Sequence, residues 1–181
     1  MLLASLLLKL GGYGFLRFSL TFLADASTRF APLLTVSALL GVIYGALATI
    51  RQIDLKRIIA YSSVSHMNLT MLGLFSRNQQ GIEGAIYLMV AHGVVSAALF
   101  FCIGVLYDRH HSRLLRYYGG LVKVMPLFSA LFLAFSLANM GFPGTANFPG
   151  ELGTFQGIFN ENPTTAAFSA LAIVLGAVYS V

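Results

Sequence analysis

The chain has 181 residues, of which 57% are hydrophobic and 9% are charged, and its mean hydropathy is +0.81. Soluble domains carry about 25% charged residues, and disordered chains combine low hydrophobicity with high net charge, so both classes are excluded. A polytopic membrane protein remains. The formal net charge of +5 at pH 7 then indicates basic loops on one side of a membrane rather than a nucleic-acid surface.

Six apolar runs, each close to the roughly 20 residues that span a bilayer, follow one another with short polar breaks. The fifth run breaks at Gly141-Phe142-Pro143-Gly144 and again at Pro149-Gly150, directly before Glu151. We therefore expect an all-α polytopic helix bundle of six spans, a single transmembrane domain over residues 1–181, with a broken helix between Pro143 and Glu151. The runs are residues 2–18, 31–50, 58–75, 82–106, 126–140 and 166–181.

The basic residues predict the orientation of these spans. Taking the loops alternately across the membrane, seven Lys and Arg residues fall on one side and three on the other. Loops rich in Lys and Arg face the cytoplasm or the mitochondrial matrix, so we expect residues 51–57, residues 107–123 and the Met1 end on that side. Without tryptophan, the eight tyrosines are expected to mark the membrane surface. The seven basic residues on the first side are Arg51, Lys56, Arg57, Arg109, Arg113, Arg116 and Lys123, and the three on the other side are Arg17, Arg29 and Arg77.

Four ionisable residues lie in, or at the broken edge of, apolar runs: Lys9, His66, His92 and Glu151. Such groups cost about 2.5–3.5 kcal/mol each at membrane depth, so a chain that keeps several usually uses them. A desolvated lysine and histidines with an unperturbed pKa near 6.5 suit proton relay. Each has an alternative interpretation: Lys9 could snorkel to the interface, the histidines could be satisfied core residues beside serines, and Glu151 could be an ordinary loop residue.

The sequence offers little for metals, nucleotides or redox centres. Neither buried histidine has a second ligand at helical spacing, and the single cysteine, Cys102, cannot form a cysteine metal site. No GxGxxG, P-loop or CxxC pattern occurs. Glu83 is expected to be an interfacial carboxylate, and His110 and His111 to lie in a solvated loop. We therefore predict no cofactor and no metal in this chain.

Three segments are distinctive when taken together: LLKLGGYG at residues 7–14, RQIDLKRIIAYSSVSHM at 51–67 and AHG at 91–93. They resemble one family, the antiporter-like proton-pumping subunits of respiratory complex I. Further agreement comes from LYDR with HSR at residues 106–113, YGGL at 118–121 and LANM leading into FPGT at 137–145. The resemblance covers essentially the whole chain.

The resemblance implies roles for the four buried groups. Lys9 is similar to the lysine of the family's eighth helix, which links two half-channels along the mid-plane of the membrane. His66 and His92 are similar to relay positions on the tenth and eleventh helices. Glu151 is similar to the glutamate at the break in the twelfth helix, beside the exit toward the intermembrane space. Here Pro149 stands where the family more often has an aliphatic residue, and it is expected to make the break more rigid.

The resemblance also implies a setting. Proton translocation across the mitochondrial inner membrane, or alternatively a bacterial plasma membrane, would be coupled to NADH oxidation and ubiquinone reduction, with NADH, FMN and iron–sulfur clusters held by other subunits. Family members have about fourteen helices, and this chain resembles only the eighth to the thirteenth. We expect another chain or segment to supply the first half, beside other membrane-arm subunits and lipids, with no nucleic acid. The alternatives are a subunit of a cation/proton antiporter or membrane-bound hydrogenase, and a structural or assembly fragment that pumps nothing.

Overall fold

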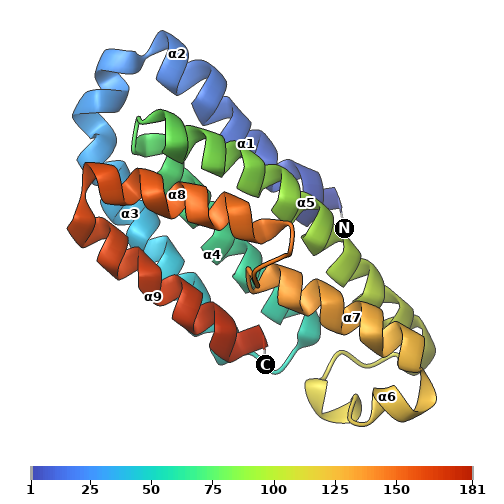
Figure 1. The fold of residues 1–181 in the computed structure, drawn as a ribbon. Helices are drawn as coiled ribbons and strands as arrows, with labels where there is room; N and C mark the ends of the chain where they lie inside the picture. Colours follow the sequence, from blue (N-terminus) through green and yellow to red (C-terminus); the bar gives the residue numbers. More distant parts are fainter. Residues whose placement is uncertain (1, 181) are drawn as a thin grey trace.

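The computed structural model describes residues 2–180, which are almost entirely helical and contain no strand beyond one isolated bridge (Figure 1). The predicted all-α helix bundle is confirmed. Met1, which belongs to the orientation prediction, and Val181, which ends the sixth predicted run, lie outside the described residues. In chain order the elements are η1 (Leu3–Leu7), α1 (Leu8–Gly14), η2 (Phe15–Ser19), α2 (Leu20–Phe22), α3 (Ala24–Ile50), α4 (Leu55–Phe75), α5 (Gln79–His110), η3 (Leu115–Tyr117), α6 (Leu121–Val124), α7 (Pro126–Asn139), α8 (Asn147–Glu161) and α9 (Pro163–Ser180).

The first span is a continuous helix in which π-helical turns, η1 and η2, alternate with α-helical ones, α1 and α2. It ends at Leu23, whose φ of −117° and ψ of 41° turn the chain into α3. The polar residues 24–29, which the sequence suggests as a loop, instead form the start of α3. Asp25 lies in the first turn of this helix, where a negative charge complements the helix dipole.

Within residues 2–180, three helices are long and apolar enough by themselves to cross a membrane, namely α3, α5 and α9. The helices of the other three predicted spans are not long or apolar enough by themselves, for local reasons. The first is interrupted by its π-helical turns, and α4 carries a run of buried polar side chains that includes Ser62, Ser65 and His66. The fifth is divided into α7 and α8.

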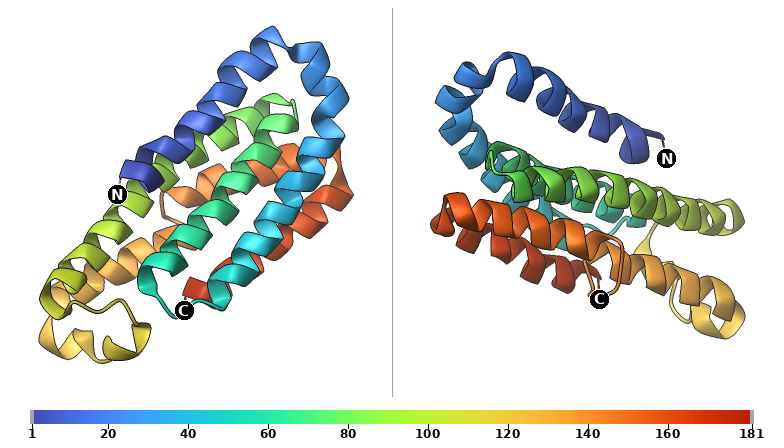
Figure 2. Two further views of the ribbon diagram at one scale, coloured as in Figure 1. Left: turned by 180° about the vertical axis from the view of Figure 1, so that it is seen from behind. Right: turned by 45° about the horizontal axis from the view of Figure 1, so that its top comes forward.

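The two most basic loops lie together at one end of the bundle. Leu55 N–H donates to the carbonyl of Arg113 (3.0 Å) and Leu115 N–H donates to that of Ile53 (3.1 Å). Lys56 also lies over the ring of Tyr107, with Nζ 4.4 Å from the ring centroid. The turns that follow α2, α4 and α8 lie at the opposite end (Figures 1 and 2). The residues counted on one side by charge therefore do share one end of the fold.

Glycines hold α5 and the broken helix α7–α8 close together, and the two run side by side (Figure 2). A Cβ atom on Gly84 would lie 2.9 Å from Gly153 Cα, and one on Gly150 would lie 2.8 Å from the backbone N and Cα of Leu88. Real Cβ atoms do not approach so closely, so these positions require glycine. Small residues of this kind let helix backbones approach in membranes. The close contact fixes the position of Glu151 along the neighbouring helix α5.

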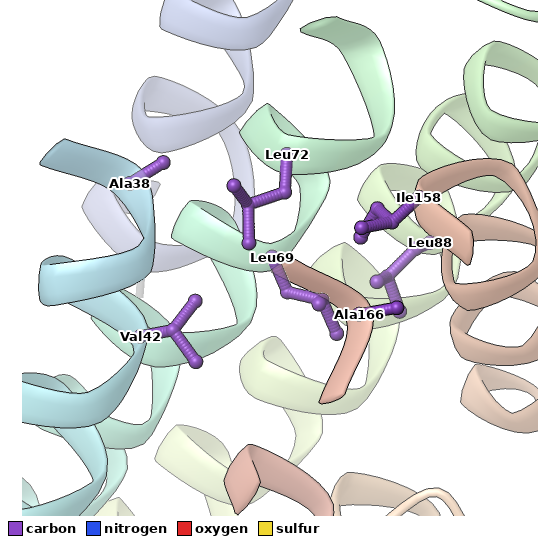
Figure 3. Close-up of a cluster of buried hydrophobic side chains, with 7 residues drawn as sticks. All are labelled: Ala38, Val42, Leu69, Leu72, Leu88, Ile158 and Ala166. Atoms are coloured by element: carbon purple, nitrogen blue, oxygen red, sulfur yellow. The ribbon is translucent and has the colours of Figure 1, made fainter. Parts of the chain in front are cut away.

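Two apolar clusters enclose a polar layer in the middle of the bundle. The first cluster draws residues from α3, α4, α5, α8 and α9 (Figure 3): Ala38, Val42, Leu69, Leu72, Leu88, Ile158 and Ala166. The second lies toward the basic end and joins α4, α5 and α7: Leu55, Ile59, Val95, Leu99, Ile103 and Ala138. Along α4 and α5, His66 and His92 fall between these two clusters, so apolar side chains separate them from both ends of the bundle.

Candidate proton-transfer site

Lys9 points toward α5 and contacts His92. Its Nζ atom lies 3.1 Å from His92 Nδ1 and also donates to the carbonyl of Ala4. Gly93 makes room for this contact, since a Cβ atom there would lie 3.2 Å from the carbonyl oxygen of Ser5 and 3.6 Å from Lys9 Cε. The side chain is therefore turned inward and does not snorkel. For His92 Nδ1 to accept from Lys9, the imidazole proton must be on Nε2.

The two buried histidines lie against each other. The ring centroids of His66 on α4 and His92 on α5 are 5.0 Å apart, with an angle of 44° between the ring planes. His92 is completely buried and His66 is 9% exposed. They are therefore not independent core residues that neighbouring serines satisfy, because each contacts another ionisable side chain.

Glu151 on α8 closes the series. Its Oε1 atom lies 3.5 Å from Nδ1 of His66, within ion-pair distance if the imidazole is protonated. Glu151 is 5% exposed, so the interpretation as an ordinary loop glutamate is wrong. The order of contacts is Lys9, His92, His66, Glu151, which brings all four predicted residues together from four different spans.

The break in the fifth span differs from the prediction in one respect. The helix stops at Asn139 and resumes at Asn147, so Pro149 and Gly150 lie within the first turn of α8 and do not break it. Proline is tolerated there because the first helical N–H groups have no partner inside the helix. Glu151 is consequently held by a regular helix, not by an unwound segment. Pro149 therefore lies outside the break, in the helix that follows it.

Gly141 shapes the break around the carboxylate. It has a φ of +72°, a conformation that glycine adopts without the steric cost of a side chain. A Cβ atom on Gly141 would overlap Oε2 of Glu151 and lie 2.6 Å from its Cδ. The sequence marks Gly141 as a breaker only, whereas the structure places the Glu151 carboxylate in the space that its missing side chain leaves.

Tyr179 was not identified from the sequence. Its hydroxyl lies 3.4 Å from Nε2 of His66, on the opposite side of the ring from the nitrogen that faces Glu151. With Ser65 and Met140 these residues line a cavity of about 10 Å³, the size of one water molecule. The expectation that all tyrosines mark the membrane surface is wrong for Tyr179, because its hydroxyl contacts the buried His66. In the sequence, Tyr179 ends an apolar run and therefore resembles an interfacial residue.

Two asparagines at the edges of the break were also missed. Asn139 is 6% exposed and Asn147 is fully buried. Oδ1 of Asn139, both amide atoms of Asn147 and Nε2 of His92 have no hydrogen-bond partner among the described residues. Buried polar groups of this kind are normally satisfied by internal water. In the sequence, Asn139 lies inside an apolar run, which was an available signal, whereas Asn147 lies outside every run.

The four groups form a continuous buried series of ionisable side chains. Amine, imidazole and carboxylate groups all change protonation state in catalysis and proton pumping, and here successive groups lie close together. Apolar clusters lie on either side of this series along the bundle. The fold and this site define a polytopic membrane protein with a buried series of ionisable side chains through its centre.

The chain belongs to the family of transmembrane subunits described as "NADH:quinone oxidoreductase/Mrp antiporter, TM", which matches residues 1–176. It is 55% identical over 179 residues to the NADH-ubiquinone oxidoreductase chain 4 of Marchantia polymorpha, and 56% identical over 179 residues to that of Triticum aestivum. The chain 4 of Chondrus crispus is 55% identical over 180 residues. Each of these alignments covers 99% of the present chain.

Solved structures agree with this family membership. A chain of respiratory complex I from Thermus thermophilus is 34% identical, with a TM-score of 0.90 over 95% of the present chain and 37% of its own. A chain of the Mrp complex from a Dietzia species is 24% identical, with a TM-score of 0.81 over 86% of the present chain and 29% of its own, and shares the fold. The present chain spans only 36–37% of the length of these chain 4 relatives.

Proposed function

We propose that this chain carries part of the proton path of a proton-translocating subunit of NADH:quinone oxidoreductase. The observation that carries the proposal is the buried series Lys9, His92, His66 and Glu151, with contacts of 3.1 Å at one end and 3.5 Å at the other. The high identity to chain 4 of several mitochondria-bearing organisms supports the same assignment. Proton movement would be driven by redox chemistry in other subunits, and this chain would perform none itself.

The sequence of proton steps follows the contacts. Lys9 gives a proton to Nδ1 of His92, which faces it, and His92 then releases the proton on Nε2 to His66, whose ring is tilted by 44° to its own with the centroids 5.0 Å apart. His66 Nδ1 then gives a proton to the Glu151 carboxylate. Each transfer leaves the donor ready for the next proton. Opposite charges on neighbouring groups favour each other's charged state, so the occupancy of one group biases the next.

The setting of this activity is part of the proposal. The loops around residues 51–57 and 107–123 would face the matrix, because they carry most of the basic residues and lie at one end of the fold. The membrane would be the mitochondrial inner membrane. Other membrane-arm subunits would be partners, and the part of the relatives that this chain does not cover would deliver protons to Lys9. No cofactor or metal is assigned to this chain.

The test replaces the two ends of the path in the intact enzyme that contains this chain. Lys9→Met and Glu151→Gln remove the ionisable group and keep most of the side-chain volume. The purified enzyme is reconstituted into liposomes, and the ratio of protons moved to electrons transferred is measured. Both variants should assemble, reduce quinone and move fewer protons per electron.

Matched controls use exposed residues of the same types. Lys123→Met and Glu83→Gln should leave the ratio unchanged, because Lys123 is exposed in the basic loop and Glu83 is exposed beside Gln79. A normal ratio in both Lys9→Met and Glu151→Gln would overturn the proposal and favour a structural role. Proton movement that requires sodium and no quinone would favour a cation/proton antiporter subunit.

A further inference from the structure

The end of α8 that lies farthest from the break is tied to the turn between α4 and α5. Asn78, in that turn, donates from Nδ2 to the carbonyl of Gly157 on α8 at 2.6 Å. Gly157 leaves room for this approach, because a Cβ atom there would overlap Gly81 and lie 2.8 Å from Oδ1 of Asn78. The hydrogen bond therefore joins a loop side chain to the backbone of the helix that carries Glu151.

Two further contacts join α8 to the same region. Arg77 pairs with Glu161 at 3.3 Å, and Asn160 donates to Gln80 at 2.8 Å. Both are contacts between exposed side chains, where water competes for the same groups and an ion pair contributes little. Asn78 is half-buried and its partner is a backbone carbonyl, so its hydrogen bond is the contact that holds this end of α8 most firmly.

The end of α8 at the break has no comparable anchor. Residues 140–146 are not helical and include two glycines at positive φ, so α7 cannot fix the position of α8 by helical continuity. The side-chain amide of Asn147 has no hydrogen-bond partner among residues 2–180. In the same part of the chain, the hydrogen bonds and ion pairs that join α8 to other elements lie at residues 157–161, apart from the contact of Glu151 with His66. These directional contacts supplement the glycine packing between α5 and α8.

We propose that Asn78 is a positioning residue for Glu151, which it holds against His66 through α8. The inference rests on the proposed function, because it concerns the contact between Glu151 and His66. Glu151 and Gly157 belong to one regular helix and are separated along it by about 9 Å at 1.5 Å per residue. Backbone hydrogen bonds make this short stretch move as one body. Because the Glu151 Oε1 to His66 Nδ1 distance is 3.5 Å, a small displacement of α8 decides whether a proton can pass between them.

Asn78 also relates Glu151 to the two helices that carry the histidines. Its Oδ1 atom accepts from the N–H of Gly81 at 2.7 Å and so caps the N-terminus of α5, the helix of His92. The turn that contains it follows directly on α4, the helix of His66. The two atoms of one amide thus perform two roles, since Oδ1 caps α5 and Nδ2 holds α8.

Asn78→Asp separates these two roles. A carboxylate still accepts from the N–H of Gly81, and aspartate caps helices as well as asparagine does, but it has no N–H to donate to Gly157. Asn162→Asp is the matched control. Oδ1 of Asn162 accepts from the N–H of Thr164 at 3.1 Å, and its Nδ2 donates no hydrogen bond within residues 2–180.

Asn78→Ser and Asn162→Ser repeat the comparison without adding a charge. Serine also caps helices, and its shorter side chain removes the amide that reaches α8. The serine pair keeps the test decisive if Asn78→Asp fails to assemble.

The variants are compared in the intact reconstituted enzyme, with Glu151→Gln as the reference. Two quantities are measured: the proton-to-electron ratio, and the infrared carbonyl band of protonated Glu151, which is identified by its loss in Glu151→Gln. The Asn78 variants should lower the ratio and shift the band, because the surroundings of the carboxyl group change. The Asn162 variants should change neither. A general loss of stability would lower the midpoint of thermal disassembly without shifting this band.

The outcomes distinguish the inference from the proposed function. A normal ratio and an unshifted band in the Asn78 variants, with a reduced ratio in Glu151→Gln, would overturn the inference and leave the proposed function intact. Equal changes in the Asn78 and Asn162 variants would also overturn the inference. A normal ratio in Glu151→Gln would overturn the proposed function and the inference with it.

Discussion

His66 and Glu151, which come from separate spans, face each other 3.5 Å apart in a layer enclosed by two apolar clusters. An ionisable pair at this depth is costly unless its members stabilise each other or exchange protons. Because His66 also contacts His92 and Tyr179, it is the branching point of the series.

His92 is the only one of the four series residues that contacts Lys9 directly, so replacing it should interrupt the path. His92→Gln keeps a polar side chain of similar length but cannot carry a proton as imidazolium. We expect a reduced proton-to-electron ratio, with His110→Gln, an exposed control, unchanged. The double variant Lys9→Met/His92→Gln should be no worse than either single variant, since groups acting in one series are not additive. Additive losses would mean that the two residues act separately.

Gly141 should be required for the position of Glu151 as well as for its own backbone conformation. Gly141→Ala and Gly144→Ala both place a side chain at positive φ, which costs roughly 1–3 kcal/mol. Only the Cβ atom at residue 141 overlaps the Glu151 carboxylate, whereas nothing lies within 4 Å of one at residue 144. Both variants should lower thermal stability, and Gly141→Ala alone should also lower the proton-to-electron ratio. Equal ratios in the two would show that Gly141 acts through the backbone only.

Gly84 should set the distance between α5 and α8. A Cβ atom there would collide with the backbone of Gly153 and Thr154, so Gly84→Ala must push the helices apart. Overpacking of this kind costs typically about 1–3 kcal/mol. Gly104, on the same helix, has open space around it, and Gly104→Ala should be neutral or slightly stabilising. The midpoint of thermal disassembly of the intact enzyme measures both. An unchanged midpoint in Gly84→Ala would contradict the observed packing.

Much of the fold and most of the site follow from the sequence because the physics of a membrane is restrictive. A lysine, two histidines and a glutamate in apolar runs are costly enough to be noticed one residue at a time, and the structure brings all four together. The basic loops likewise reveal which ends of the spans lie together.

The remaining features depend on packing that a single sequence does not display. Tyr179 resembles any tyrosine at the end of a span, and its role depends on a neighbour from α4. Gly141 and Gly84 matter because of which atoms lie beside them, not because of their type. Pro149 was misjudged because proline breaks a helix interior but fits a first turn, and only the structure shows that α8 begins at Asn147.

The most direct test of the central claim is to observe protonation of Glu151 itself during turnover. Infrared difference spectra of the intact enzyme, recorded before and after NADH is added in the presence of quinone, report carboxyl groups that gain or lose a proton. The proton path predicts a carbonyl band of a protonated carboxylic acid that changes with turnover and is missing in Glu151→Gln, but persists in Glu83→Gln. Identical difference spectra for the unaltered enzyme and Glu151→Gln would contradict it.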